Sequence, residues 1–217
     1  MIEIRFLAVF CLYCLPLALS CGANTDEALR SYVAGKEAFA RKDLRTAHDR
    51  FTGAINSDGS LHNARLMLAK VHYYEKNFDA SLKEVERILK KDDDHVGALY
   101  WKARIRVVRP SEKSSDTEAM TLLTRVLELD AHHLPARSLL ALLYEKNGKY
   151  REALHEYLVI LSEEESLIDA RANLGVLYSR LGLREKALAE IDRAISISRA
   201  GGHSDERLRS LKKEIAE

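Results

Sequence analysis

The sequence predicts an all-α fold, a solenoid of five helix pairs closed by a capping helix, and three observations favour it. The chain of 217 residues is 47 % hydrophobic and 31 % charged, with ten Gly and only three Pro, a composition typical of globular, helix-forming proteins. After Asn24, apolar residues recur at helical spacing between short breaks. The third observation is an internal repeat of fixed length, which indicates a stack of similar units.

One small residue in each odd-numbered helix defines the period. These residues, called here the small-residue column, are separated by 34, 34, 38 and 34 residues: Gly35, Ala69, Ala103, Ala141 and Gly175. The even-numbered helices repeat with matching spacing in three further columns: Ala47, Ser81, Ala119, Ala153 and Ala187; Phe51, Val85, Leu123, Tyr157 and Ile191; and Ala54, Ile88, Val126, Ile160 and Ala194. Since two antiparallel helices cannot cover their own apolar faces, each pair is expected to stack on the next through its small residues.

These columns resemble the tetratricopeptide repeat, from about Ala28 to Ser198. In the fifth unit, the places of the family's leucine-glycine pair, tyrosine, turn glycine and small-aromatic-small series are held by Leu174-Gly175, Tyr178, Gly182, Ala187, Ile191 and Ala194. Four residues occupy places usually held by alanine, and the closing proline of the repeat is missing: Ser81, Ile88, Val126 and Ile160. The resemblance implies a right-handed α-solenoid in a domain over 28–217, with units at about 28–60, 61–94, 95–131, 132–165 and 166–200.

The first twenty residues predict a signal peptide, 1–20, followed by a tether over 21–27. The uncharged run from Phe6 to Leu19 would cover about 21 Å as a helix, less than the roughly 30 Å hydrocarbon core of a membrane. Two kinds of processing fit its end. Small residues suit an ordinary signal peptidase, whereas the segment 17–22 resembles a relaxed bacterial lipobox that would make Cys21 a lipid anchor. All three cysteines lie within the first 21 residues, so none can cross-link the body of the chain.

Two segments interrupt or end the repeats. The single 38-residue step places an insertion over 109–116, where Pro110 cannot continue a helix and Asp116 can cap the next one. This insertion is either a protruding contact loop or tolerated surface length. After Gly201-Gly202, a capping helix over 204–217 is predicted, with Leu208, Leu211 and Ile215 on one face.

The resemblance implies that partners lie in a concave groove lined by the odd-numbered helices. The position after each small residue is called here the +1 column. In the first three units it holds a cation, Lys36, Lys70 and Arg104, and in the last two it holds Leu142 and Val176. With the aromatic and apolar side chains around the cations, the candidate binding residues are Tyr32, Lys36, Phe39, Leu66, Lys70, Tyr73, Tyr74, Tyr100 and Arg104. Such a basic, aromatic groove suits an extended peptide or a carboxylate-bearing ligand. The alternative is that the lysines are simply solvated and the aromatics form inter-helix core.

Charge and motifs exclude other classes of function. The formal net charge is +1, although residues 28–110 hold 17 basic and 11 acidic side chains, so no nucleic-acid partner is expected. His155-Glu156 opens like a zinc-protease helix, but Val159 stands where the second histidine must be. No nucleophile elbow, phosphate-binding loop or dinucleotide fingerprint occurs. We therefore expect no catalytic residues, no metal and no cofactor.

The leading hypothesis is an exported, lipid-anchored scaffold of the periplasm or cell envelope. It would bind a protein or an extended peptide in its groove, attach to a membrane through Cys21, and help assemble envelope components. The alternative is a periplasmic subunit that binds a small anionic ligand for a solute-uptake system. A shared fold does not distinguish the scaffold from the ligand-binding subunit, because function depends on the residues of the site.

Overall fold

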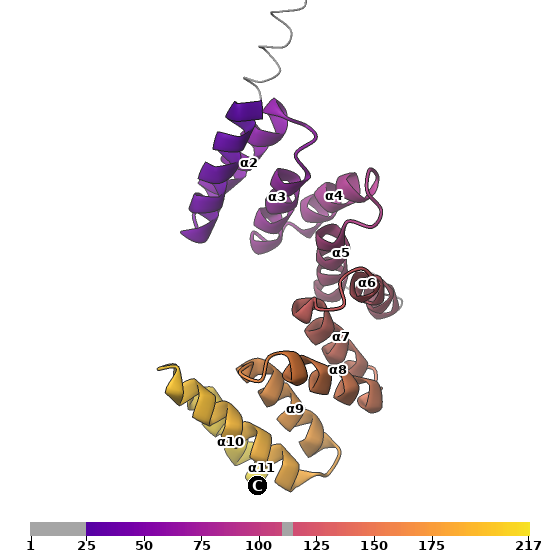
Figure 1. Ribbon diagram of the computed structural model, residues 1–217, viewed down its shortest axis with the longest axis vertical. Coiled ribbons are helices and arrows are strands. Elements are labelled where there is room, and N and C mark those ends of the chain that lie inside the picture. Colours follow the sequence, from indigo (N-terminus) through magenta and orange to yellow (C-terminus); the bar gives the residue numbers. More distant parts are fainter. Residues whose placement is uncertain (1–24, 110–114) are drawn as a thin grey trace, which may run out of the picture. The chain divides into compact units, whose positions relative to one another are not determined.

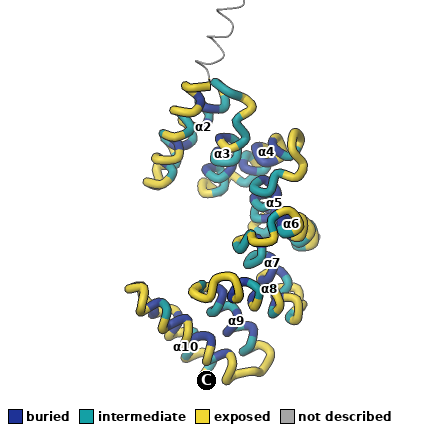
Figure 2. The backbone as a smooth tube through the Cα atoms, viewed as in Figure 1, coloured by how far each residue is buried: buried dark blue, intermediate teal, exposed yellow. Residues whose placement is uncertain are grey.

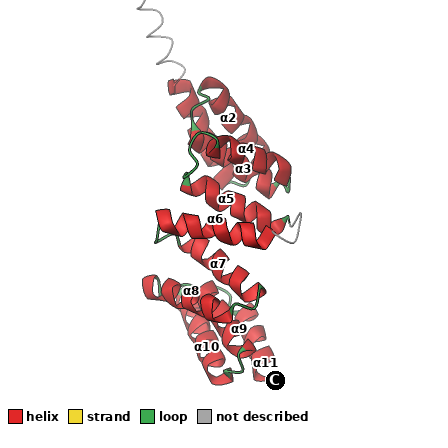
Figure 3. Ribbon diagram, turned by 90° about the vertical axis from the view of Figure 1, so that its right-hand side faces the viewer, coloured by secondary structure: helices red, strands yellow, loops and turns green. Residues whose placement is uncertain are grey.

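A computed structural model describes residues 25–109 and 115–217. The predicted signal peptide, Cys21 and most of the insertion at 109–116 lie outside the described residues. All regular structure within the described ranges is helical (Figure 1, Figure 3), and none of those helices is long and apolar enough to cross a membrane. The chain divides into two compact units at Arg109 and Pro110, which are described separately.

Unit 1 ends at Arg109 and consists of antiparallel helices joined by short turns. A first helix over 25–40 is followed by α2 (Leu44–Ser57), α3 (His62–Tyr74), α4 (Phe78–Leu89) and α5 (Val96–Val108). Each of α2 to α5 packs on the helix that follows or precedes it in the chain, and α3 also contacts α5. The contact between α3 and α5 places these two odd-numbered helices side by side, as a stack of helix pairs requires.

Unit 2 is built in the same way and ends with an additional helix. Its helices are α6 (Ser115–Leu129), α7 (Leu134–Lys146), α8 (Tyr150–Glu163), α9 (Ile168–Arg180), α10 (Arg184–Ala200) and α11 (Glu206–Ala216). The last of them, α11, packs on α10 and α9 and buries Leu208. The predicted all-α class of paired helices is thus confirmed.

The repeat columns belong to the buried core of both units, and Figure 2 colours the buried positions of each helix dark blue. Every residue of the four columns is buried, and all fifteen in the even-numbered helices have no exposed surface. The glycines of the small-residue column are needed for close approach. A Cβ atom added to Gly35 would lie 2.6 Å from Phe51 Cε1, and one added to Gly175 would lie 2.7 Å from Ile191 Cδ1.

The turn inside a pair uses a left-handed residue at a repeating position. Gly148 and Gly182 have φ of 72° and 74°, and Lys42 and Lys76 have φ of 63° and 62° at the equivalent places. Glycine adopts this conformation without steric cost, whereas a lysine does so against its preference. The even-numbered helices of the first two pairs are capped by Asp43 and Asn77, whose side chains accept hydrogen bonds from the Thr46 and Ala80 N–H groups.

A repeated ion pair joins the two helices of three pairs. An arginine of the odd-numbered helix and a glutamate 19 residues later approach within 2.7, 2.7 and 2.8 Å: Arg65–Glu84, Arg137–Glu156 and Arg171–Glu190. These side chains are only 9–16 % exposed. This ion pair was not predicted from the sequence, although both partners recur with the period of the repeat.

Candidate functional site

The cations of the +1 column come from three odd-numbered helices of unit 1. Lys36 lies on the 25–40 helix, Lys70 on α3 and Arg104 on α5. Lys36 is exposed, whereas Lys70 and Arg104 are half-buried. Each cation directly follows a buried small residue. That small residue faces the other helix of its pair, so the next position along the helix faces the neighbouring odd-numbered helices.

Arg104 lies among three aromatic rings. Its guanidinium carbon is 4.5 Å from the ring centre of Trp101, 5.0 Å from that of Tyr73 and 5.8 Å from that of Tyr100. The Lys70 ammonium lies 5.5 Å from the Trp101 ring. These distances are those of cation–π interactions, which hold the two cations in place without neutralising them.

The rings also contact one another across adjacent helices. Tyr73 lies edge-on to Trp101 and to Phe78, with ring centres 5.1 and 5.6 Å apart, and Phe39 lies 5.7 Å from Tyr74. We call this set the aromatic cluster: Phe39, Tyr73, Tyr74, Phe78, Tyr100 and Trp101. Tyr74 is 52 % exposed while Trp101 is 6 % exposed. The cluster therefore has a rigid interior and an accessible aromatic surface.

The electrostatics of the site favour a bound anion. Burial lowers the pKa of Lys70, and the neighbouring Arg104 charge lowers it further. Burial raises the pKa of Tyr100, while the charge and hydrogen bond of Arg104 oppose that rise. No carboxylate of the described residues lies within 4.0 Å of Lys36, Lys70 or Arg104. Two mutually repelling, partly desolvated cations are stabilised when an anion joins them.

The other predicted residues have mixed roles. Tyr32 packs on Phe51 with ring centres 6.0 Å apart, and its own ring lies 5.7 Å from the Lys36 ammonium. Leu66 packs close to Gly97, where an added Cβ would lie 2.8 Å from its Cδ2 atom. Tyr32 and Leu66 thus both pack against buried core residues.

Trp101 belongs to the site but was not among the residues predicted from the sequence. It contacts three aromatic side chains and both half-buried cations. Two signals could have found it: it is the chain's sole tryptophan, and it stands three residues before Arg104, a spacing that places two side chains on one helix face.

No part of the described chain suggests a metal centre. Among residues 25–109 and 115–217, no group of three or more His, Cys, Asp and Glu side chains is arranged to hold an ion. His133 instead caps α7, because its Nδ1 accepts the Ala136 N–H hydrogen bond at 3.1 Å.

Comparisons with known proteins agree with this architecture. Residues 168–200 match the family model of the tetratricopeptide repeat. A thermophilic tetratricopeptide-repeat protein of Thermus thermophilus is 17 % identical and superposes with a TM-score of 0.70, over 87 % of this chain and 98 % of that one. YrrB, described as a tetratricopeptide-repeat protein with an unusual peptide-binding site, is 21 % identical with a TM-score of 0.63, over 91 % and 97 % of the two chains.

A third similar structure is MamA from Desulfovibrio magneticus RS-1, 14 % identical with a TM-score of 0.67, over 81 % of this chain and 97 % of that one. The curated proteins compared with the sequence contain no match. The chain therefore has the fold of a tetratricopeptide-repeat protein.

Proposed function

We propose that this protein is an exported, lipid-anchored scaffold whose unit 1 binds an extended, carboxylate-bearing segment of a partner protein. The observation that carries the proposal is the pair Lys70 and Arg104, held against the aromatic cluster, with Lys36 beside the Tyr32 ring on the 25–40 helix. None of these three cations has a carboxylate partner among the described residues. The peptide-binding site ascribed to YrrB supports such use of this fold.

Binding would combine two interactions. A carboxylate of the segment accepts charge-assisted hydrogen bonds from Arg104 and Lys70, which are stronger than bonds between neutral groups. Neighbouring apolar side chains of the segment pack on Tyr74 and Phe39, where aromatic surface is accessible. Because the rings already fix Arg104, little side-chain entropy is lost on binding.

A charge-reversal variant tests the binding site. We expect Lys36→Glu with Lys70→Glu and Arg104→Glu to weaken binding of an extended peptide that alternates glutamate and leucine by about 30-fold, or about 2 kcal/mol. Fluorescence anisotropy of a labelled peptide measures this, and Trp101 fluorescence reports occupancy at the site itself. Helical content is expected to stay unchanged, and the corresponding triple glutamine variant serves if reversal perturbs the fold.

The matched control uses two cations outside the +1 column. Lys149 and Lys186 each lie 5.8 Å from a tyrosine ring, as Lys36 does at 5.7 Å, so reversing both changes charge in a similar setting. Equal loss of binding in the control, or no loss in the triple variant, contradicts the proposed site. Succinate binding as tight as peptide binding would instead favour the small-anion alternative.

The export and anchoring part of the proposal rests on the leader and Cys21. The protein isolated from its native membrane is expected to begin at Cys21 and to exceed the mass of the unmodified chain by the mass of its acyl groups, since several acyl chains hold a protein on a membrane stably. Intact-mass spectrometry measures both. An unmodified chain, or one cut elsewhere, removes the anchor, and the role in assembling envelope components then loses its support.

A further inference from the structure

The two turns inside the helix pairs of unit 2 form a basic surface. The segment 146–151 leads from α7 into α8, the segment 180–186 leads from α9 into α10, and together they hold six cations and one carboxylate. The ends of α7 and α9 are neighbours, because Arg180 Nε lies 3.2 Å from Glu145 Oε1. We call this surface the basic edge, and all six of its cations are exposed: Lys146, Lys149, Arg151, Arg180, Arg184 and Lys186.

Most cations of the basic edge have no carboxylate partner. Lys146 pairs with Asp116 at 2.8 Å, and Arg180 with the glutamate of α7 just described. The remaining four lie more than 4.0 Å from every carboxylate of the described residues: Lys149, Arg151, Arg184 and Lys186. Two exposed glutamates, Glu152 and Glu185, lie in the first turns of α8 and α10 and leave the cations in excess.

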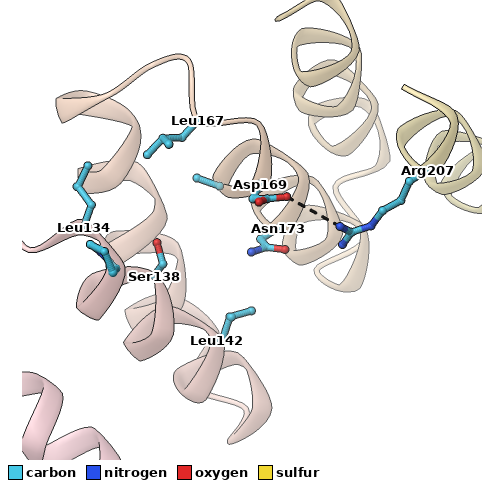
Figure 4. Close-up of a pocket in the computed structure, with 9 residues that line it drawn as sticks. Leu134, Ser138, Leu142, Leu167, Asp169, Asn173 and Arg207 are labelled. Carbon is cyan, nitrogen blue, oxygen red and sulfur yellow. Dashed lines mark ion pairs between the residues drawn. The ribbon is translucent and has the colours of Figure 1, made fainter. Parts of the chain in front are cut away.

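The other ends of the same helices are acidic. The segments 130–133 and 163–167 hold four carboxylates and no lysine or arginine. Asp169, in the first turn of α9, lies 3.9 Å from Arg207 of α11, and both side chains are at least 85 % exposed (Figure 4). The 13 residues of α9 separate its two ends (Figure 1) by about 20 Å. Since the Debye length is about 8 Å at physiological ionic strength, the acidic ends do not cancel the attraction of the basic edge for an anionic surface.

Two exposed leucines lie between the cations of the basic edge. Leu181 and Leu183 flank Gly182, whose φ is 74°, and are 39 % and 41 % exposed. In the other turns inside a pair that have a left-handed residue, both flanking positions are polar: Arg41 and Asp43, Glu75 and Asn77, and Asn147 and Lys149. Local structure does not favour leucine here, because Leu183 provides no side-chain hydrogen bond at the start of α10, whereas Asp43 and Asn77 cap their helices.

Exposed leucines among cations suit the surface of an anionic bilayer. Leucine side chains enter the boundary between headgroups and acyl chains, while lysine and arginine attract anionic headgroups. A protein partner would need a pocket that fits both leucines, since protein interfaces are closely complementary in shape. A fluid bilayer accepts the leucines without such a pocket, and its mobile headgroups can pair with cations that have no fixed partner.

We infer that unit 2 docks on an anionic membrane surface through the basic edge, with Leu181 and Leu183 inserted at the level of the headgroups. The C-terminal end of α9 and the N-terminal end of α10 then face the bilayer, and the acidic ends of these helices face away from it. This contact goes beyond the peptide binding proposed for unit 1 and does not depend on an acyl group at Cys21.

Vesicle binding tests the inference. The protein used is the chain from residue 22 onward, which keeps every described residue and lacks both the apolar leader and Cys21. It is expected to co-sediment with vesicles of phosphatidylcholine that contain about 30 % phosphatidylglycerol, and to bind about tenfold more weakly to vesicles of phosphatidylcholine alone.

Leu181→Asn with Leu183→Asn tests the leucines, because it copies Asn147 and Asn77 of the other turns. We expect the affinity for the anionic vesicles to fall about tenfold, or about 1.4 kcal/mol. Asparagine at position 183 can cap α10, so the melting temperature is expected to rise, and weaker binding then does not come from unfolding. Leu158→Asn is the control, since Leu158 is 48 % exposed on α8 outside the basic edge.

Arg184→Gln with Lys186→Gln tests the cations and is expected to weaken binding to the anionic vesicles about tenfold, with a smaller dependence on salt. Its control, Arg125→Gln with Arg207→Gln, removes the same charge from exposed positions near the acidic ends.

Three results would overturn the inference: no binding to the anionic vesicles, equal binding to neutral and anionic vesicles, or losses in the edge variants no larger than in their controls. Binding to soluble polyglutamate as tight as to the vesicles would also overturn it, because an acidic protein would then be the partner. None of these outcomes depends on peptide binding by unit 1 or on acylation.

Discussion

Replacing Glu190 by alanine is expected to destabilise the protein by about 3 kcal/mol, because it leaves a buried cation without its partner. Glu190 accepts from Arg171 at 2.8 Å and from Arg193 at 2.6 Å. The Arg171 side chain is 12 % exposed and also donates from Nε to the Glu165 carbonyl, so it cannot turn to solvent without losing that second bond. Urea denaturation of the wild type and the variant measures the difference in free energy of unfolding.

Glu185→Ala is the matched control for this prediction. Glu185 is an exposed glutamate in the first turn of the same helix, and its loss is expected to cost less than about 0.5 kcal/mol. A double variant, Arg171→Leu with Glu190→Leu, copies the leucines that the third repeat has at these positions, Leu99 and Leu122. It is expected to be more stable than Glu190→Ala, since it leaves no buried charge unpaired: the remaining partner of Glu190, Arg193, is 63 % exposed and stays solvated. A cost for Glu190→Ala no larger than that of the control would contradict the buried ion pair.

Gly175→Leu is expected to destabilise the protein by about 3 kcal/mol through overpacking. A Cβ atom at this position would lie 2.7 Å from Ile191 Cδ1 and 3.2 Å from the Ala187 carbonyl oxygen. The Ile191 side chain has no exposed surface, and a backbone oxygen within α10 cannot move aside. The higher helix propensity of leucine offsets only about 1 kcal/mol. Thermal and urea unfolding are the measurements.

Two further variants identify the cause as local crowding. Gly59 lies in a turn, and the nearest atom to an added Cβ is 3.8 Å away, so Gly59→Leu should be nearly neutral. Gly175→Ala with Ile191→Val reproduces the Ala69 and Val85 pair of the second repeat and removes the Cδ1 atom. We expect this double variant to be more stable than Gly175→Ala alone. Greater instability of the double variant would rule out crowding against Ile191.

Much of the fold can be predicted because its determinants are local and repeated. Within a helix, buried residues follow one another at three or four positions and so lie on one face. The next repeat has a residue of the same kind at a fixed distance along the chain, which supports the same assignment. The columns containing Phe51 and Tyr157 are buried as expected for that reason. The repeated arginine–glutamate pairs have the same regularity, but partners 19 residues apart on two helices are recognised only once the helices are paired in space.

The candidate site could be predicted only in part. Spacing places Lys36, Lys70 and Arg104 at equivalent positions, but it does not say that Arg104 lies among three rings or that Trp101 contacts both half-buried cations. Those contacts depend on rotamers and on the distance between neighbouring odd-numbered helices. For the same reason the spacing could not separate Tyr74, which is accessible, from Tyr32, which mainly packs on Phe51.

By itself, the sequence determined the all-α class, the period of the helix pairs and the small residues that allow them to stack, since each depends on residue type and spacing along one chain. Only the tertiary structure decided which cations lack a carboxylate and that Trp101 contacts both half-buried cations. These properties depend on the volume and charge that side chains of different helices contribute to one space, and spacing along the chain does not specify them.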